Sequence, residues 1–136
     1  DLKLKIDYNP IIYTYPSEVN QVILNILKNA EDVLLEKNIN EPTIEIISYK
    51  NNKSNKDYAV IEIKDNAGGI PEDIKDRVMD SYFTTKEDAD GTGIGLYMSK
   101  IIISEHMEGK LEVNNVEFMH EQKFHLGAEF KIMLPV

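Results

Sequence analysis

The segment Gly91-Thr92-Gly93-Ile94-Gly95-Leu96 places three glycines at alternate positions, directly before an apolar run at residues 96–103. Glycine allows backbone conformations that are closed to other residues and lets a ligand approach the main chain closely. The apolar run has the content of a buried helix. A glycine-rich turn that opens into a helix presents free N–H groups and the positive end of the helix dipole. This stretch therefore predicts a phosphate-binding turn, around which the rest of the chain is organised.

Size and composition indicate one globular domain. The chain has 136 residues, of which 42% are hydrophobic, enough for a core of its own. The net charge of −9 argues against non-specific binding to nucleic acid or to anionic membranes. It leaves room for an anionic ligand held by local N–H groups. The absence of cysteine excludes disulfides, thiolate metal sites and a cysteine nucleophile.

No apolar run is long enough to span a membrane, and no signal peptide opens the chain. We therefore expect no membrane segment in this fragment. Because the chain starts abruptly on strand-like residues, we expect it to be an excised domain of a larger protein.

Hydrophobic periodicity predicts the secondary structure. The longest helix is expected at residues 17–37, where apolar residues recur at helical spacing, and a shorter one at 71–78. A third is expected at 93–107. Strands are expected at 2–8, 43–49, 58–64, 109–115 and 124–134, with a further short apolar segment at 11–15. The polar stretches 50–57 and 116–123 are interpreted as loops between strands.

This order of elements predicts an α/β (α+β) two-layer sandwich. A mixed, mostly antiparallel sheet of about five strands would be covered on one face by three helices. The elements do not alternate as βαβ repeats, which speaks against a Rossmann fold. The glycine turn lacks the Gly-Lys-Ser/Thr of a Walker loop.

Two asparagines mark the long helix. Asn25 and Asn29 lie four residues apart, so they project from one helical face. Asparagine is a poor residue for a helix interior. The pair is explained equally well by a solvated face or by a ligand-binding role, since an amide oxygen suits Mg²⁺.

A second group follows the strand at 58–64. Asp65 stands at the strand end, before Gly68 and Gly69. An ordinary Asp/Gly turn is the simpler explanation of this segment alone. A buried carboxylate, however, needs a fixed donor such as an exocyclic amine. The stretch at 84–92 lacks an apolar anchor, so we expect a mobile loop that closes over a ligand, with Lys86 able to reach a phosphate. The three histidines are scattered and are interpreted as structural or exposed.

Taken together, these motifs resemble those of the ATP-binding catalytic domain of sensor histidine kinases, in the GHKL (Bergerat-fold) superfamily. Residues 25–30 resemble its N box, 65–70 its G1 box, 80–86 its F box and 91–96 its G2 box. The ending at 127–135 resembles the last strand of the family. The resemblance spans nearly the whole chain, and four motifs in the family's order argue against a chance match.

The resemblance implies ATP and Mg²⁺ as cofactors. Asn29 would ligate Mg²⁺, and Asp65 would accept a hydrogen bond from the adenine amine. Lys86 would approach the terminal phosphates and act in catalysis with Asn29. The nucleotide-binding residues that the resemblance implies are Asn25, Lys28, Asn29, Asp32, Asp65, Gly69, Ile70, Thr85, Lys86, Gly91, Thr92, Gly93, Ile94, Gly95 and Leu96.

The chain departs from the family pattern at several positions. Ala67 stands where glycine is usual and should stiffen the turn, and Ser81-Tyr82 stand where Pro-Phe is usual, which bears on docking of the lid. Ala128 replaces a frequent threonine, whose hydroxyl could hold a water-mediated adenine contact. Asp32 lies where many relatives carry a basic residue, so phosphate binding would lean more on nearby lysines.

The chain also lacks a phosphoacceptor motif. No histidine is followed by the acid and downstream proline of an H box; His106 precedes Met107. We expect the receiving histidine on a separate dimerisation domain of a homodimeric parent, with a response regulator receiver domain as the next acceptor. The resemblance implies a bacterial cytoplasmic domain whose parent is often membrane-attached. Nucleic acid is not an expected partner.

Three other functions compete with the kinase. The fold also serves chaperone, gyrase and mismatch-repair ATPases, and anti-sigma serine kinases. A degenerate module could keep the fold for docking alone. The Thr84-Thr85-Lys86 sequence and the compact ending at 134–135 favour the kinase, and retention of Asn29, Asp65 and the glycines argues against a degenerate module.

Overall fold

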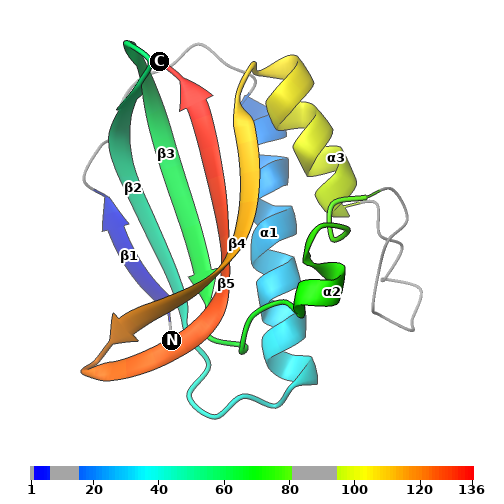
Figure 1. Cartoon of the computed structure of the whole chain (residues 1–136), viewed down its shortest axis with the longest axis vertical. Helices are drawn as coiled ribbons and strands as arrows, with labels where there is room; N and C mark the ends of the chain where they lie inside the picture. The colour runs from blue at the N-terminus through cyan, green and yellow to red at the C-terminus, as the bar shows by residue number, and fades with distance from the viewer. Residues whose placement is uncertain (1, 7–15, 81–94) are drawn as a thin grey trace.

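Five strands form one sheet in the order β1-β2-β3-β5-β4 (Figure 1). This is seen in a computed structural model that describes residues 2–6, 16–80 and 95–136. β1 is parallel to β2, and the other three pairs are antiparallel. The expected mixed, mostly antiparallel sheet is therefore confirmed. The strands are β1 Leu2–Ile6, β2 Ile44–Lys53, β3 Lys56–Asp65, β4 Lys110–His120 and β5 Lys123–Pro135.

Both hairpins are longer than the sequence predicts. The loops expected at 50–57 and 116–123 shrink to two-residue turns at Ser54-Asn55 and Glu121-Gln122. All four turn residues have positive φ, between 51° and 65°, which is the type I′ geometry that matches strand twist. These segments were predicted as loops because their side chains are polar. Residues of a strand that face solvent can be polar, since they pair through their backbone. His120 consequently lies buried in β4 rather than in a loop.

The helices agree with the prediction in place but less so in length. α1 spans Pro16–Glu36, within one residue of the expected bounds, whereas α2 is only Glu72–Lys75. The helix expected at 93–107 is α3 (Gly95–Ile101) followed by a π-helical segment, η1 (Ile102–His106). The wider π turn is a local feature that hydrophobic periodicity does not reveal. Within these segments Ile102 and Ile103 are buried, as is Met107 just after them.

The core lies between the helices and one face of the sheet (Figure 1). α1 buries a stripe at spacing four, which comprises Val22, Ile26, Ala30 and Leu34. It meets residues from β3, β5 and η1, among them Ile63, Phe130, Ile132 and Ile103. Full burial of each large apolar side chain contributes about 1.5–3 kcal/mol. The strand that leads to Asp65 is thus anchored in the core.

The other face of the sheet is charged. Lys64 Nζ lies 3.8 Å from Glu45 Oε1, 3.6 Å from Glu62 Oε1 and 4.0 Å from Glu129 Oε2. The three carboxylates come from β2, β3 and β5 and are themselves largely buried. One ammonium is thus shared among three largely buried acids.

Some expected features fall on residues outside the described ranges. These are residues 7–8 of the first strand, the segment 11–15, and the loop at 84–92. Within the described ranges, no helix has the length and apolarity needed to cross a bilayer.

Candidate functional site

Asp65 ends β3 with a fixed and buried carboxylate. Its Oδ1 accepts hydrogen bonds from the backbone N–H of Ala67 (3.0 Å) and of Ala128 (3.3 Å). Burial raises the pKa of Asp65, while the two backbone N–H groups and the charge of Lys37 oppose that rise. Both of these bonds fall on Oδ1, so Oδ2 keeps acceptor capacity for a donor on a ligand.

The turn after Asp65 requires its glycines. Gly68 and Gly69 have φ of +89° and +88°, which side chains tolerate poorly. The Gly68 N–H donates to the carbonyl of Leu126 (3.0 Å), and the Lys37 ammonium donates to the carbonyl of Ala67 (2.8 Å). The turn is therefore tied to β5 on one side and to the residue just after α1 on the other.

The side chain of Asn66 also stabilises this turn. Its Oδ1 accepts from the Thr43 N–H (2.9 Å), and its Nδ2 donates to the Glu41 carbonyl (3.1 Å) and lies 3.3 Å from His125 Nδ1. Asn66 is buried, and these bonds satisfy both ends of its amide. Its role is to hold the loop that enters β2, which leaves Asp65 as the polar group available to a ligand.

On α1, Asn25 contacts the start of α3 rather than lying on a solvated face. Its Nδ2 lies 3.3 Å from Ser99 Oγ and 3.4 Å from the carbonyl of Gly95, and its Oδ1 accepts from Gln21 Nε2 (3.0 Å). Asn25 therefore lies next to Gly95, the last glycine of the turn at 91–95. Ser99 Oγ in turn donates to the Gly95 carbonyl (2.8 Å).

Asn29 lies one turn further along α1 and is half-buried. No described residue forms a hydrogen bond with its amide. A hard amide oxygen in this state suits Mg²⁺, so Asn29 fits the metal predicted for it. The part of the chain that the structure describes contains no cluster of three His, Cys, Asp or Glu side chains able to hold a metal.

The remaining predicted residues divide into two groups. Ile70 and Leu96 are half-buried against the core, Lys28 is exposed and Asp32 is half-buried on α1. Thr85, Lys86, Gly91, Thr92, Gly93 and Ile94 lie outside the described residues, as does most of the F box.

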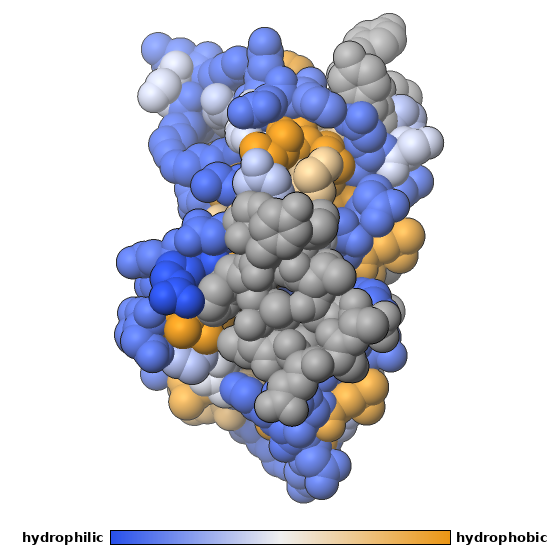
Figure 2. Space-filling view, turned by 90° about the vertical axis from the view of Figure 1, so that its right-hand side faces the viewer, coloured by the Kyte–Doolittle hydropathy of each residue, from blue (hydrophilic) through white to orange (hydrophobic). Residues whose placement is uncertain are grey.

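Two ends of a site are laid out along α1. Asn29 lies on the helix, and Lys37, at its C-terminal end, contacts the Asp65 turn. Lys37 follows Asn29 by eight residues, so the two ends of the candidate site lie apart along α1. Figure 2 shows that the side carrying α2 and α3 is mostly hydrophilic in its described part.

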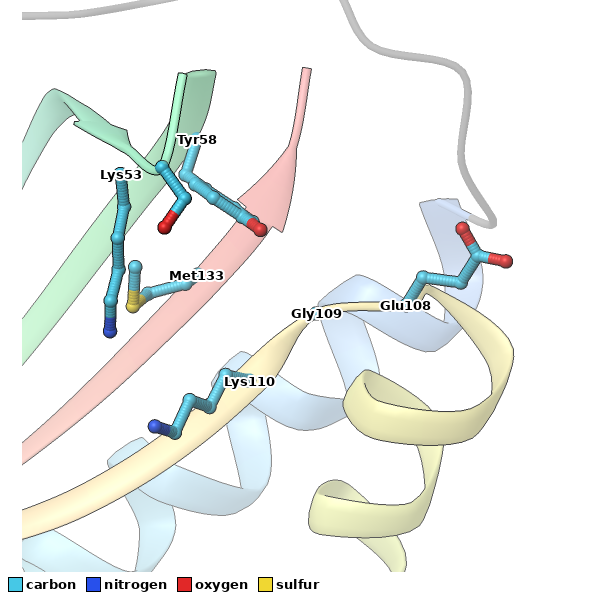
Figure 3. A pocket seen from close by; sticks show the side chains of 7 residues that line it. Lys53, Tyr58, Glu108, Gly109, Lys110 and Met133 are labelled. Carbon is cyan, nitrogen blue, oxygen red and sulfur yellow. The ribbon is translucent and has the colours of Figure 1, made fainter. Parts of the chain in front are cut away.

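A separate hollow of about 310 Å³ lies at the other end of the sheet (Figure 3). Tyr58, which helps line it, precedes Asp65 by seven residues on β3, or about 23 Å of extended strand. None of the predicted site residues lines it. Its Lys110 pairs with Glu112 (3.0 Å). This hollow is distinct from the candidate site.

Three residues of the site were not singled out by the sequence: Lys37, Asn66 and Asn115. Asn115 lies in β4 and bonds to Ile70 through both ends of its side-chain amide (2.7 Å and 2.8 Å). The one available signal was its residue type, since asparagine is depleted in strands.

Comparisons with known proteins identify the family of this chain. Residues 14–136 match the family described as histidine kinase-, DNA gyrase B-, and HSP90-like ATPase. Sporulation kinase E of Bacillus subtilis is 37% identical over 131 residues, which cover 96% of this chain and 15% of that protein. Sensor kinase CckA of Brucella abortus is 30% identical over 146 residues, covering 99% of this chain and 14% of that protein. The chain thus spans about a seventh of the length of these relatives.

Solved structures show the same fold. The catalytic domain of histidine kinase ThkA superposes with a TM-score of 0.72 at 24% identity, over 99% of this chain and 79% of that one. The mycobacterial sensor histidine kinase MprB gives a TM-score of 0.73 at 21% identity, over 98% of this chain and 81% of that one. Fold, motif order and family match lead to one conclusion: the chain belongs to the histidine kinase-, DNA gyrase B- and HSP90-like ATPase family, as an ATP-binding domain of the sensor histidine kinase type.

Proposed function

We propose that this domain binds Mg²⁺-ATP and donates the γ-phosphoryl group to a histidine of its parent sensor kinase. The acceptor would lie on a separate dimerisation and phosphoacceptor domain of a homodimer, and the phosphoryl group would then pass to an aspartate of a response regulator. Support comes from the family match and from relatives that are named as a sporulation kinase and a sensor kinase.

The observation that carries the proposal is the Asp65 carboxylate. It is buried, and its Oδ1 accepts hydrogen bonds from two backbone amides. The exocyclic amine of adenine would donate to such an acceptor, whereas guanine presents a carbonyl oxygen at the same position. Two acceptors facing each other without a proton repel, so Asp65 favours ATP over GTP.

At the other end, Asn29 would hold Mg²⁺, and Asn25 would keep the start of α3 close to it. The metal supplies neutralisation of the phosphate charge when it is bound. Lys86, with Thr85 and the glycine turn at 91–95, completes the proposed phosphate site. Of the remaining predicted residues, Gly69 and Ile70 would contact the base, and Lys28 and Leu96 would lie near the phosphates. Asp32, an acid where many relatives carry a base, would lie near the phosphates without attracting them. The protein contributes position and electrostatics, which is the general logic of phosphoryl transfer.

The first test is calorimetric titration of the domain with non-hydrolysable analogues of ATP and of GTP. We expect saturable binding of the ATP analogue, weaker binding of the GTP analogue, and loss of this preference in Asp65→Asn. Asp57→Asn is the matched control, because Asp57 lies at the other end of β3 and its carboxylate bonds only to Asn52 and Lys50 in the described part.

The second test adds the parent's dimerisation domain and measures acid-labile phosphohistidine formed from ATP. A folded domain that fails to bind the ATP analogue at millimolar concentration would overturn the proposal and favour a docking module. Binding and hydrolysis without phosphohistidine would instead favour an ATPase of the chaperone or gyrase type.

A further inference from the structure

Asn115 of β4 pairs with the peptide of Ile70 as a neighbouring strand would. Its Oδ1 accepts from the Ile70 N–H at 2.7 Å, and its Nδ2 donates to the Ile70 carbonyl at 2.8 Å. Nδ2 also lies 3.3 Å from Glu72 Oε1. One side-chain amide thus supplies both the acceptor and the donor that an extended backbone residue needs.

This contact fixes a segment that lies beyond the end of β3. The Gly68 N–H is held by the Leu126 carbonyl of β5, and Ile70 is held by Asn115 of β4. The β4–β5 hairpin therefore holds the turn at two points, two residues apart. Gly69 lies between these points, and any movement of the hairpin would carry the turn with it.

The approach of Asn115 depends on Gly69. A Cβ atom at Gly69 would lie 2.9 Å from Asn115 Oδ1, closer than real Cβ contacts, and Gly69 has φ of +88°. The glycine thus lets the amide reach the Ile70 peptide. Aspartate at 115 would keep the acceptor but lose the donor, and would place negative charge beside a carbonyl oxygen.

We propose that Asn115 is a positioning residue for nucleotide binding, which sets the place of Gly69 and Ile70 relative to the Asp65 carboxylate. The inference rests on the proposed function, in which these three residues contact the base. Asn115 acts through Ile70 and has no contact with the phosphates in this assignment, so its effect belongs to the base end of the site.

The test compares Asn115→Ala with Asn114→Ala. Asn114 is the adjacent residue of β4; it is exposed, and its side chain forms no hydrogen bond with a described residue. Dissociation constants for ATP and ADP are measured by calorimetry well below the unfolding temperature of each protein. Asn115→Ala should weaken both nucleotides by the same factor, about tenfold, because one to two net hydrogen bonds that order the turn are lost. Asn114→Ala should bind like the wild type.

Amide hydrogen exchange gives a readout that does not require nucleotide. The Ile70 N–H should exchange faster in Asn115→Ala and at the wild-type rate in Asn114→Ala. If Asn115→Ala does not fold, Asn115→Asp serves in its place. That variant should also weaken both nucleotides by one common factor, because it loses the donor to the Ile70 carbonyl and places negative charge beside that oxygen and beside Glu72.

The outcomes separate the two proposals. Wild-type affinity in Asn115→Ala, with faster exchange at Ile70, would overturn the positioning role and leave the proposed function standing. A loss confined to ATP, with ADP unaffected, would also overturn it, because the effect would then lie at the terminal phosphate. Failure of the wild-type domain to bind either nucleotide would overturn the proposed function itself.

Discussion

A Cβ atom on Gly127 would lie 1.5 Å from the carbonyl oxygen of Asp65. The backbone of β5 thus passes directly against the end of β3, just beyond the last residue pair of the two strands, Lys64 with Glu129. The same approach brings the Ala128 N–H to Asp65 Oδ1. Absence of a side chain at position 127 is therefore a condition for the carboxylate geometry on which the proposed function depends.

Gly127→Ala should be severely destabilising. The added methyl group would meet the main chain at a point where two strands are fixed, and a backbone atom cannot turn aside as a side chain can. We expect a loss of about 3 kcal/mol or more in the free energy of unfolding, or failure to fold, measured by urea denaturation. Gly68→Ala is the control: its Cβ would make only an ordinary contact, 3.9 Å to Lys37 Nζ, but would have a strained φ, at a cost of about 1–3 kcal/mol. Equal costs for the two variants would contradict the steric explanation.

Asp65→Asn should separate stability from binding. The asparagine oxygen can still accept from Ala67 and Ala128, whereas the amide nitrogen cannot accept from adenine. We expect at least about tenfold weaker ATP binding in a fully folded protein, measured by calorimetry. Retained affinity would exclude Asp65 as the acceptor for the base.

The stability of Asp65→Asn should also depend on pH in a defined direction. Burial raises the pKa of Asp65 in the folded state, so the folded wild type binds more protons than the unfolded chain. The contribution of Asp65 to the free energy of unfolding of the wild type therefore falls as the pH rises from the pKa of Asp65 in the unfolded chain to its pKa in the folded state. Asparagine does not ionise, so Asp65→Asn does not lose stability in this way. The difference in unfolding temperature between Asp65→Asn and the wild type should therefore grow, in favour of the variant, across that pH range and vanish at lower pH. An advantage that shrinks with rising pH would contradict the assignment.

Asn29→Ala should remove the Mg²⁺ dependence of nucleotide binding. The free energy of unfolding should change by less than about 0.5 kcal/mol, because alanine favours a helix and the Asn29 amide has no partner among the described residues. Calorimetric titration with and without Mg²⁺ checks this, with Asn20→Ala on the exposed part of α1 as the control. A variant whose affinity still rises with Mg²⁺ would rule out Asn29 as the ligand.

Ser99→Ala should destabilise the domain more than Ser104→Ala. Both hydroxyls donate to a carbonyl four residues earlier, at 2.8 Å and 2.7 Å. Ser99 is fully buried and also accepts from Asn25, whereas Ser104 is exposed. We expect a loss of about 1–2 kcal/mol for Ser99→Ala and less than about 0.5 kcal/mol for Ser104→Ala, by denaturant titration. Similar values would mean that the bond between α1 and α3 contributes little.

On the charged face of the sheet, opposite the core, replacing Glu62 or Glu129 by glutamine should change the stability of the fold in opposite directions. Burial opposes ionisation of Glu62, but the Tyr49 hydroxyl, Lys64 and Lys131 together hold its pKa below the usual range. Burial, and then the charge of Glu62, raise the pKa of Glu129. Above the carboxyl range, Glu129→Gln should therefore stabilise the fold and Glu62→Gln should destabilise it.

Thermal unfolding between pH 3 and pH 8 tests this pair. The benefit of Glu129→Gln should disappear as pH falls through the folded pKa of Glu129, because the wild-type carboxyl is then already neutral. The deficit of Glu62→Gln should shrink once Glu62 itself is protonated. Shifts of the same sign for both variants at neutral pH would contradict the assigned directions.

Much of the fold was predictable from local pattern. The buried stripe of α1 follows a period that only a helix satisfies, so its bounds agree with the prediction to within one residue. Pairing of β2 with β3 followed from two apolar strands in sequence. Polar hairpin ends were predicted as loops, because residue type reports exposure and not backbone pairing. The π-helical turn of η1 left no mark in the periodicity.

For the site, the sequence by itself determined which residues we predict to carry the chemistry: Asp65 at a strand end, the amides of Asn25 and Asn29 on one helical face, and the glycines. These are local facts, set by spacing within single elements. Only the tertiary structure decided what each one touches. Asn25 reaches Gly95 and Ser99, Gly127 makes room for Asp65, and Asn115 holds Ile70, across separations of 45 to 74 residues. Such contacts depend on sheet order and register, which arise from packing of the whole core and which no local pattern encodes.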